Sequence, residues 1–215
     1  SPIKNGSTDA ILDASTLIGY EVTVSAAIEK LKELLGTTGV ENINYYKGNK
    51  EKLTNDWKNV DCSIRNRFDE LGVIDAENKY LGGVTNQFES EVVYHSQNVN
   101  DDGIIFTSTD DALQKYPDLF KEYFNHLVNY AENKYTALNG AVWRGGSFIY
   151  IPKGVKVNRP LQSYFRIETE SLGQFERTII IVDEGADLSY IEGCTAKNFS
   201  ASSLHAGVVE IYIKK

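Results

Sequence analysis

Residues 175 to 185 read FERTIIIVDEG, and this stretch decides the fold class. Its five consecutive β-branched residues, 178 to 182, predict a buried strand, and the Asp-Glu-Gly that follows predicts a turn. Similar short runs surround it: FIYIPKGVKV (148–157), LQSYFRIE (161–168), ADLSYIEG (186–193) and HAGVVEIYIKK (205–215). Because no helical pattern of about 10 residues separates these runs, a βαβ sheet is disfavoured, while a sandwich, a barrel and a solenoid all remain compatible.

Before residue 142 the hydrophobic period is helical. Apolar residues recur at intervals of three and four, which predicts helices over about 24–35, 57–71, 80–88 and 117–132. Residues 1–22 carry little periodicity. The chain is therefore expected to be an α+β protein, with helices first and strands second.

Charge and composition limit the class of protein. The net charge of −8 argues against a nucleic-acid binder that works by neutralising phosphates. No apolar run approaches the roughly 18 residues that a membrane helix needs. The start at Ser1 shows no secretory signal, and the chain contains no methionine, so we expect a processed, engineered or partial product. Two distant cysteines fit no disulfide framework, which favours a reducing compartment, either the cytoplasm or an organelle interior.

Cys194, in the string YIEGCTA, is the first candidate for chemistry. Gly193 before it suggests a turn-like pause between strands, where a thiol is accessible; a small buried hydrophobic residue is the alternative. A thiolate would be favoured by Arg166 or Lys197 and opposed by Glu192.

Other candidates are weaker. His205 follows Cys194 by 11 positions, so a cysteine–histidine nucleophile pair is formally available, although no orienting Asn or Asp is identifiable. Cys62 fits an incidental thiol at the start of a helix. The cysteines and histidines show no zinc-ligand spacing, and the chain has no phosphate-binding or dinucleotide motif. Arg166 and Glu168 lie two apart in a predicted strand, and hence on one face, either inner or outer.

Five strings closely resemble the SufB scaffold proteins of the SUF iron–sulfur cluster assembly machinery: YLGGVTNQFESEVVYH (80–95), ALNGAVWRGGSFIYIPKGVKV (137–157), PLQSYFRIETESLGQFERTIIIVDEG (160–185), YIEGCTA (190–196) and LHAGVVEIYIKK (204–215). The resemblance runs from about residue 42 to 215. It implies a helical N-terminal domain at 42–140 and the first rungs of a right-handed parallel β-helix at 141–215, truncated at the C-terminus. Residues 1–41, with one amphipathic helix, have no counterpart.

The resemblance also implies roles. Cys194 matches the family's sulfur acceptor, which receives persulfide sulfur from a cysteine desulfurase and a SufE- or SufU-type carrier. Arg166 matches an arginine of the interior sulfur path, which places it, with Glu168, on the inner face beside Cys194. The family usually has asparagine at the position of Glu168, so this carboxylate is expected to weaken the action of Arg166.

Partners and cofactors follow in the same way. The resemblance implies complexes with the ATPase SufC and with SufD, ATP hydrolysis in SufC rather than here, and a nascent iron–sulfur cluster in full-length proteins. Cluster ligands are expected downstream of Lys215, so this chain alone is expected to hold no metal. Two alternatives stay open: a SufB-derived structural or interaction module without sulfur chemistry, and a cysteine hydrolase that uses Cys194 and His205.

Overall fold

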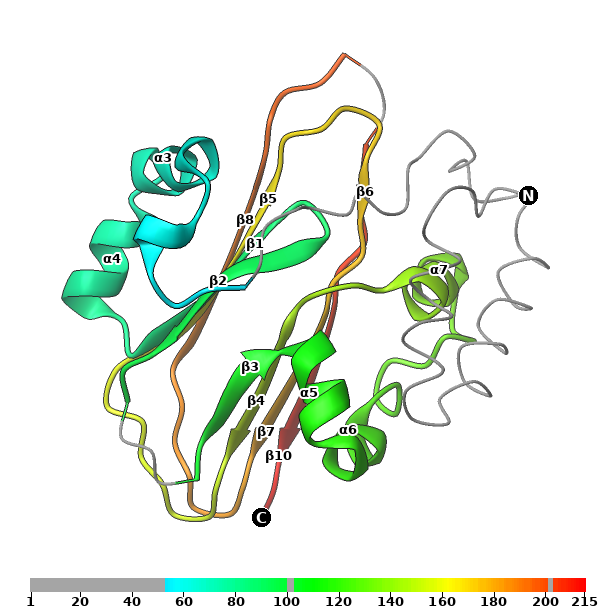
Figure 1. Cartoon of the computed structure of the whole chain (residues 1–215). Coiled ribbons are helices and arrows are strands. Elements are labelled where there is room, and N and C mark those ends of the chain that lie inside the picture. Colours follow the sequence, from blue (N-terminus) through cyan, green and yellow to red (C-terminus); the bar gives the residue numbers. More distant parts are fainter. Residues whose placement is uncertain (1–52, 100–102, 201–202) are drawn as a thin grey trace.

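The structure is a computed structural model that describes residues 53–99, 103–200 and 203–215. Helices and a few strands come first, and strands alone follow residue 142 (Figure 1). In chain order the elements are η2 (Trp57–Asn59), α3 (Cys62–Glu70), α4 (Val73–Tyr80), β1 (Gly83–Phe88), β2 (Glu91–Gln97), β3 (Ile105–Ser108), α5 (Thr109–Lys115), α6 (Pro117–Tyr123), α7 (Lys134–Val142), β4 (Ser147–Ile151), β5 (Leu161–Ile167), β6 (Gly173–Gln174), β7 (Arg177–Val182), β8 (Tyr190–Ala196), β9 (Leu204–His205) and β10 (Val208–Ile213).

After α7 the chain visits three sheets in rotation. One four-stranded sheet has the order β2-β1-β5-β8, the other has the order β10-β7-β4-β3, and β6 pairs with β9. The pairs β4–β7, β7–β10, β5–β8 and β6–β9 are all parallel, so each strand lies beside the strand that occupied the same sheet one circuit earlier. β2 and β3 add antiparallel strands to β1 and β4. The described part is therefore a mixed α+β structure that is rich in parallel pairing.

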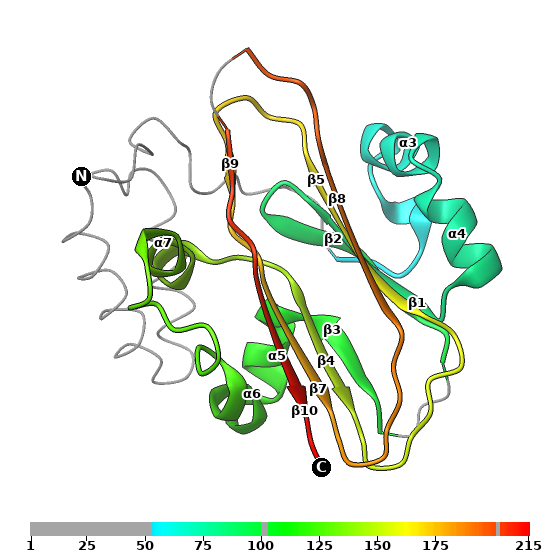
Figure 2. The same cartoon turned by 180° about the vertical axis from the view of Figure 1, so that it is seen from behind.

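Helices cover the outer faces of the two larger sheets (Figures 1 and 2). Phe68 of α3 and Tyr164 of β5 belong to a cluster under α3 and α4, which also takes in Trp57. Phe120 of α6 and Phe148 of β4 belong to a second cluster, which includes Trp143. A third cluster lies between the sheets and contains Ile149, Ile151, Leu161 and Ile180.

Strand alternation assigns each side chain to a face. In β5, Leu161 packs in the cluster between the sheets, whereas Tyr164 packs against Phe68 of α3. Because successive side chains alternate, the odd-numbered residues of β5 face inward and the even-numbered residues face the helices. Ser163 fits this assignment, since its hydroxyl hydrogen-bonds to that of Ser147 on the facing sheet at 2.6 Å.

The prediction of a helix over 80–88 is wrong. α4 ends at Tyr80, and β1 occupies Gly83–Phe88, paired with β2 and β5. The four-residue spacing of Val84 and Phe88, which suggested one helical face, also places both on one face of a strand. The parallel partner β5, 78 positions along the chain from β1 in register, decides between the two.

The prediction of one helix over 117–132 is only partly right. α6 ends at Tyr123, Phe124 is extended, and Asn125 has a positive φ of 64°. The carboxylate of Glu210 accepts hydrogen bonds from the backbone N–H groups of Asn125, Leu127 and Val128, which would otherwise continue the helix. A tertiary contact thus overrides helical propensity, and the next helix, α7, begins only at Lys134.

Helix α3 confirms most of the helix predicted over 57–71, with Gly72 in the left-handed region (φ 74°) after it. The helix predicted over 24–35 and the lead 1–41 lie outside the described residues. The segment predicted as a helical domain also holds β1, β2 and β3, and its boundary at residue 140 stays a prediction. The final run is strand β10, an edge strand, with Ile213 76% exposed.

Candidate functional site: a cysteine–histidine–glutamate cluster

Cys194 lies inside strand β8 and not in the predicted turn. The register pairs it with Phe165 of β5, which is fully buried. Partner residues on parallel strands point to the same face, so Cys194 faces inward, between the sheets. β8 is the last strand of its sheet, and the thiol is exposed. In the described part of the chain, the cysteine is therefore an exposed, inward-facing residue of an edge strand.

His205 of β9 lies directly beside this thiol. The Cys194 Sγ and the His205 Nδ1 are 3.2 Å apart, within the range of a hydrogen bond to sulfur. The structure thus brings together the cysteine and the histidine that the sequence offered as a possible nucleophile pair.

Glu176 completes the cluster from the other side of the imidazole. Its Oε1 contacts the His205 Nε2, and its side chain is only 4% exposed. Sequence reasoning missed this residue, because Glu176 lies 29 positions before His205 in a segment that reads only as a strand. The coil brings them together: Gln174, two positions before Glu176, pairs in register with His205. A carboxylate that orients an imidazole beside a thiol is the arrangement that a nucleophilic cysteine uses.

The pKa of His205 is raised to about 10. Burial alone would lower it, but the hydrogen bonds to Cys194 and Glu176, and the negative charges on both, outweigh the burial. The imidazole therefore stays protonated through neutral pH. A protonated imidazole beside sulfur favours the thiolate, which is the nucleophilic form of cysteine.

Glu192 lies two residues before Cys194 in β8, hence on the same inner face, and adds a second carboxylate. It accepts a hydrogen bond from the Tyr190 hydroxyl at 3.0 Å. Burial raises the pKa of Glu192, and the nearby Glu176 raises it further, against the opposing effects of Tyr190 and His205. The cluster is thus one cation among carboxylates, with the thiol at its open side.

Two glycines shape the two faces of this region. A Cβ at Gly207 would collide with the Oε1 of Glu176 and lie 3.5 Å from the Nε2 of His205, so any side chain there displaces the carboxylate. A Cβ at Gly193 would lie 2.8 Å from the ring of Tyr164 on the helix-covered face. Gly193 is therefore required by packing inside a strand, and it does not form the turn that the sequence suggested.

Arg166 and Glu168 form an ion pair, with 3.0 Å between Nε and Oε1, but they do not lie beside Cys194. The register pairs Arg166 with Thr195, the residue after the cysteine, so Arg166 and Cys194 point to opposite faces of the sheet. Glu168 also accepts a hydrogen bond from Arg67 of α3. The expected inner-face position next to the thiol is therefore wrong, and the pair fastens α3 to the outer face.

The other cysteine is separate from the cluster. Cys62 is exposed and begins α3, whose helix packs on the outer face of the β2-β1-β5-β8 sheet. Cys194 faces the opposite side of that sheet. Cys62 therefore offers an exposed reference thiol without the histidine and glutamate.

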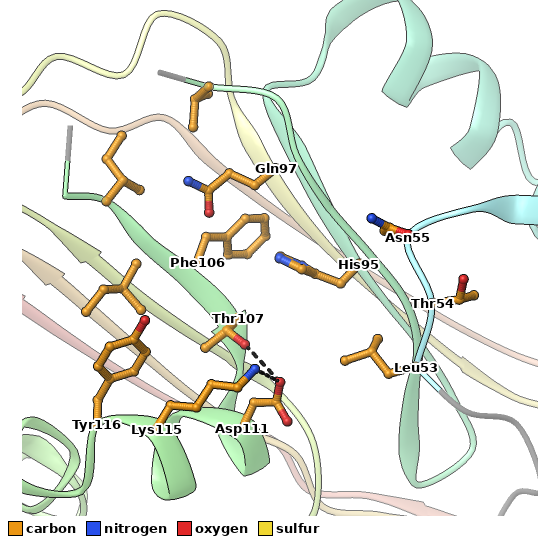
Figure 3. A pocket seen from close by; sticks show the side chains of 13 residues that line it. Leu53, Thr54, Asn55, His95, Gln97, Phe106, Thr107, Asp111, Lys115 and Tyr116 are labelled. Atoms are coloured by element: carbon orange, nitrogen blue, oxygen red, sulfur yellow. Dashed lines mark hydrogen bonds and ion pairs between the residues drawn. The ribbon is translucent and has the colours of Figure 1, made fainter. Parts of the chain in front are cut away.

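A cavity of about 690 Å³ lies elsewhere, between β2, β3 and α5 (Figure 3). Two of its polar residues bind Asp111: Lys115 with 2.7 Å between Nζ and Oδ2, and the Thr107 hydroxyl at 3.5 Å. None of the three cluster residues lines it. This cavity is therefore no part of the cysteine site.

The described residues contain neither a metal-ion site nor a membrane-spanning helix. Within 53–99, 103–200 and 203–215, no three His, Cys, Asp or Glu side chains are grouped so that they could hold a metal ion. In the same part of the chain no helix has the length and apolar character to cross a membrane.

Comparisons with known proteins place the chain in a family. Residues 73–163 match the family model of the SufBD protein N-terminal region, and residues 165–215 match the SufBD core domain of the SUF system for iron–sulfur cluster assembly. Both Cys194 and the Glu176–His205 contact lie in the core-domain match.

Curated relatives agree with these models. A protein of Staphylococcus saprophyticus described as an iron–sulfur cluster assembly SufBD family protein is 54% identical over 177 residues, which are 81% of this chain and 38% of the relative. A Staphylococcus aureus protein of the same description is 52% identical over 183 residues, 84% of this chain and 39% of the relative. The chain spans about two fifths of the length of these relatives. It belongs to the SufBD family, whose members take part in iron–sulfur cluster assembly by the SUF system.

Proposed function

We propose that this chain is a SufB-type scaffold, or part of one, that accepts persulfide sulfur on Cys194 during iron–sulfur cluster assembly. The observation that carries the proposal is the contact of the Cys194 Sγ with His205, whose other nitrogen is held by Glu176. In this reading the chain works with SufC, SufD, a cysteine desulfurase and a SufE- or SufU-type carrier. It is not a stand-alone enzyme, because ATP hydrolysis belongs to SufC.

The cluster supports a specific sulfur-transfer step. The Cys194 thiolate attacks the outer sulfur of a carrier persulfide, R–S–SH; a new S–S bond forms to Cys194 and the donor's S–S bond breaks. The donor leaves as a thiolate and takes up the persulfide proton, so Cys194–S⁻ and R–S–SH become Cys194–S–S⁻ and R–SH. His205 holds the attacking thiolate, and its charge also favours the anionic product.

The strand pairing supports the finer fold proposal, which is the beginning of a right-handed parallel β-helix. Three sheets are visited in rotation, and successive circuits pair in parallel at equal intervals: Phe148 with Ile179, and Ile179 with Glu210.

The test is to incubate the chain with desulfurase, carrier and cysteine, and to locate the added sulfur by mass spectrometry of the peptides. We expect one extra sulfur atom on Cys194, none after Cys194→Ser, and a reduced yield after His205→Gln. Cys62 is the internal control, since it is exposed and lacks the cluster. Persulfide on Cys62 but never on Cys194 would overturn the proposal. If Cys194→Ser instead changes no measurable property, the structural-module alternative gains.

A second candidate function, a cysteine hydrolase, is favoured by Glu176, since this carboxylate supplies the orienting group that the sequence did not reveal. It predicts multiple turnovers of an activated thioester, lost in both Cys194→Ser and His205→Gln. Sulfur acceptance predicts at most one acylation per chain. Turnover counting with a chromogenic thioester therefore separates the two functions.

A further inference from the structure

Gln174 lies beside the cysteine site, and the proposed transfer step gives its side chain no role. Its side chain is only 1% exposed, yet neither its Oε1 nor its Nε2 has a hydrogen-bond partner among the described residues. A buried amide left unsatisfied costs about 1–3 kcal/mol, and native proteins seldom keep one without a reason.

The position of Gln174 gives that reason. It pairs in register with His205 on the adjacent parallel strand, so both side chains point to the same face, about 4.8 Å apart at the backbone. The His205 Nδ1 in turn contacts the Cys194 Sγ. Phe175, the residue between Gln174 and Glu176, packs in the cluster under α6 and α7, which confirms that its two neighbours face the other way, inward.

The charges around the cluster indicate a role for the N–H groups of this amide. An anion on Cys194 meets the carboxylates of Glu176 and Glu192, of which the first is engaged by His205 and the second by Tyr190. The donors on this face include one N–H of the His205 imidazolium and the two N–H groups of the Gln174 amide. A transferred sulfur adds an atom about 2.05 Å beyond the Cys194 Sγ.

We infer that Gln174 binds the terminal sulfur of a Cys194 persulfide, with its side-chain N–H groups donating to the sulfur anion. The inference rests on the proposed function, because it assumes that Cys194 carries the sulfur. It assigns Gln174 to the product of the transfer and not to the free thiol, with which it shares no hydrogen bond in the structure. Hydrogen bonds to a charged acceptor are about twice as strong as neutral ones, so the amide favours the loaded state.

The experiment uses glutathione persulfide as the donor, so that no partner protein is needed. The full chain is equilibrated at fixed ratios of glutathione persulfide to glutathione, and the loaded fraction of Cys194 is read by mass spectrometry. We expect Gln174→Leu, which removes the donors at similar size, to shift the exchange equilibrium toward the donor by on the order of tenfold. Gln174→Glu, which adds a negative charge, should shift it further.

Three controls make the result decisive. The rate of alkylation of the unloaded Cys194 by iodoacetamide should stay within about twofold in Gln174→Leu, because the free thiol does not depend on the amide. Gln162 is the matched control. Its Oε1 is also buried without a partner, but its register with Ile191 places its side chain on the helix-covered face. Gln162→Leu should therefore leave the loading equilibrium unchanged. Thermal unfolding of each variant shows whether it is folded.

The outcomes separate the two proposals. An unchanged loading equilibrium in both Gln174 variants, with normal loading of the unmodified chain, overturns the role of Gln174 and leaves sulfur acceptance intact. A chain that takes no sulfur on Cys194 at all overturns the proposed function, and the role of Gln174 with it. An equal loss in Gln162→Leu and Gln174→Leu would show a general packing effect and would also overturn the inference.

Discussion

At the scale of single residues, His205 does two things at once. Its Nδ1 contacts the Cys194 thiol and its Nε2 contacts Glu176, so the ring is fixed in orientation and its charge is balanced on both sides. Either contact alone would leave one nitrogen to solvent. Both together explain why the charged form of a partly buried imidazole is favoured here.

This arrangement predicts a pH dependence with a definite sign. The pKa of His205 is about 10 in the folded chain and near 6.5 without these partners, so the protonated ring stabilises the fold fully below about pH 6.5. That contribution is lost as the pH rises through about 10. The difference in free energy of unfolding between the unmodified chain and His205→Gln should therefore shrink from pH 6 to pH 10, as measured by urea denaturation. A difference that grows with pH would contradict it.

The residues also show how far sequence reasoning reaches. Cys194 and its pairing with His205 could be named from the sequence, because both are rare residue types close together in a strand-rich region. Glu176 could not, since nothing in linear spacing marks a residue one circuit away. Arg166 was predicted to lie beside Cys194, but it pairs in register with Thr195, the next residue. Because one step along a strand reverses the face, this places Arg166 on the opposite face from the thiol.

At the scale of elements, two glycines give a matched pair of predictions. Gly207→Ala places a methyl group against the Glu176 carboxylate, so we expect slower alkylation of Cys194 by iodoacetamide, severalfold at pH 7, with little loss of stability. Gly193→Ala places a methyl group against the Tyr164 ring on the other face, so we expect a lower melting temperature and an alkylation rate near that of the unmodified chain. The reverse pattern would show that the two faces are assigned wrongly.

Elements were predictable where local preference and tertiary structure agree. The β-branched residues 178–182 lie in strand β7, which is buried on both faces, and the sequence pattern alone suffices there. Residues 117–132 fail because Glu210, more than 80 positions later, accepts the N–H groups that a helix would have used. The local sequence cannot indicate this partner, because Glu210 reaches the segment only after the chain has folded back on itself.

At the scale of the whole molecule, Arg177 and Glu210 join the coil of strands to the helical layer. Arg177 of β7 is fully buried; it donates to Glu210 of β10 at 2.8 Å and to the carbonyl of Val128 in the α6–α7 connection at 2.7 Å. Burial alone would raise the pKa of Glu210, but Arg177 and the backbone N–H groups hold it below its ordinary value. One ion pair thus connects two circuits and the connection between two helices.

Breaking this pair should be costly. Glu210→Gln keeps the shape of the side chain but leaves the Arg177 charge buried, so we expect the free energy of unfolding to fall by about 3–5 kcal/mol in chemical denaturation. The double variant Glu210→Gln/Arg177→Met removes both charges. Its loss of free energy of unfolding should be smaller than the sum of the losses in the two single variants. If Glu210→Gln lowers the free energy of unfolding by less than about 1 kcal/mol, the ion pair does not hold the strands and the helical layer together as argued.

The chain contains two tryptophans, and the fold gives one to each helical layer. Trp57 stacks on Tyr94 with 3.9 Å between ring centroids, in the layer of α3 and α4, and Trp143 packs with Phe120 and Phe124 in the layer of α6 and α7. Each side of the coil thus carries its own intrinsic fluorophore. Trp57→Phe and Trp143→Phe would each leave a single emitter, so that fluorescence could follow the loosening of one layer at a time, without any added label.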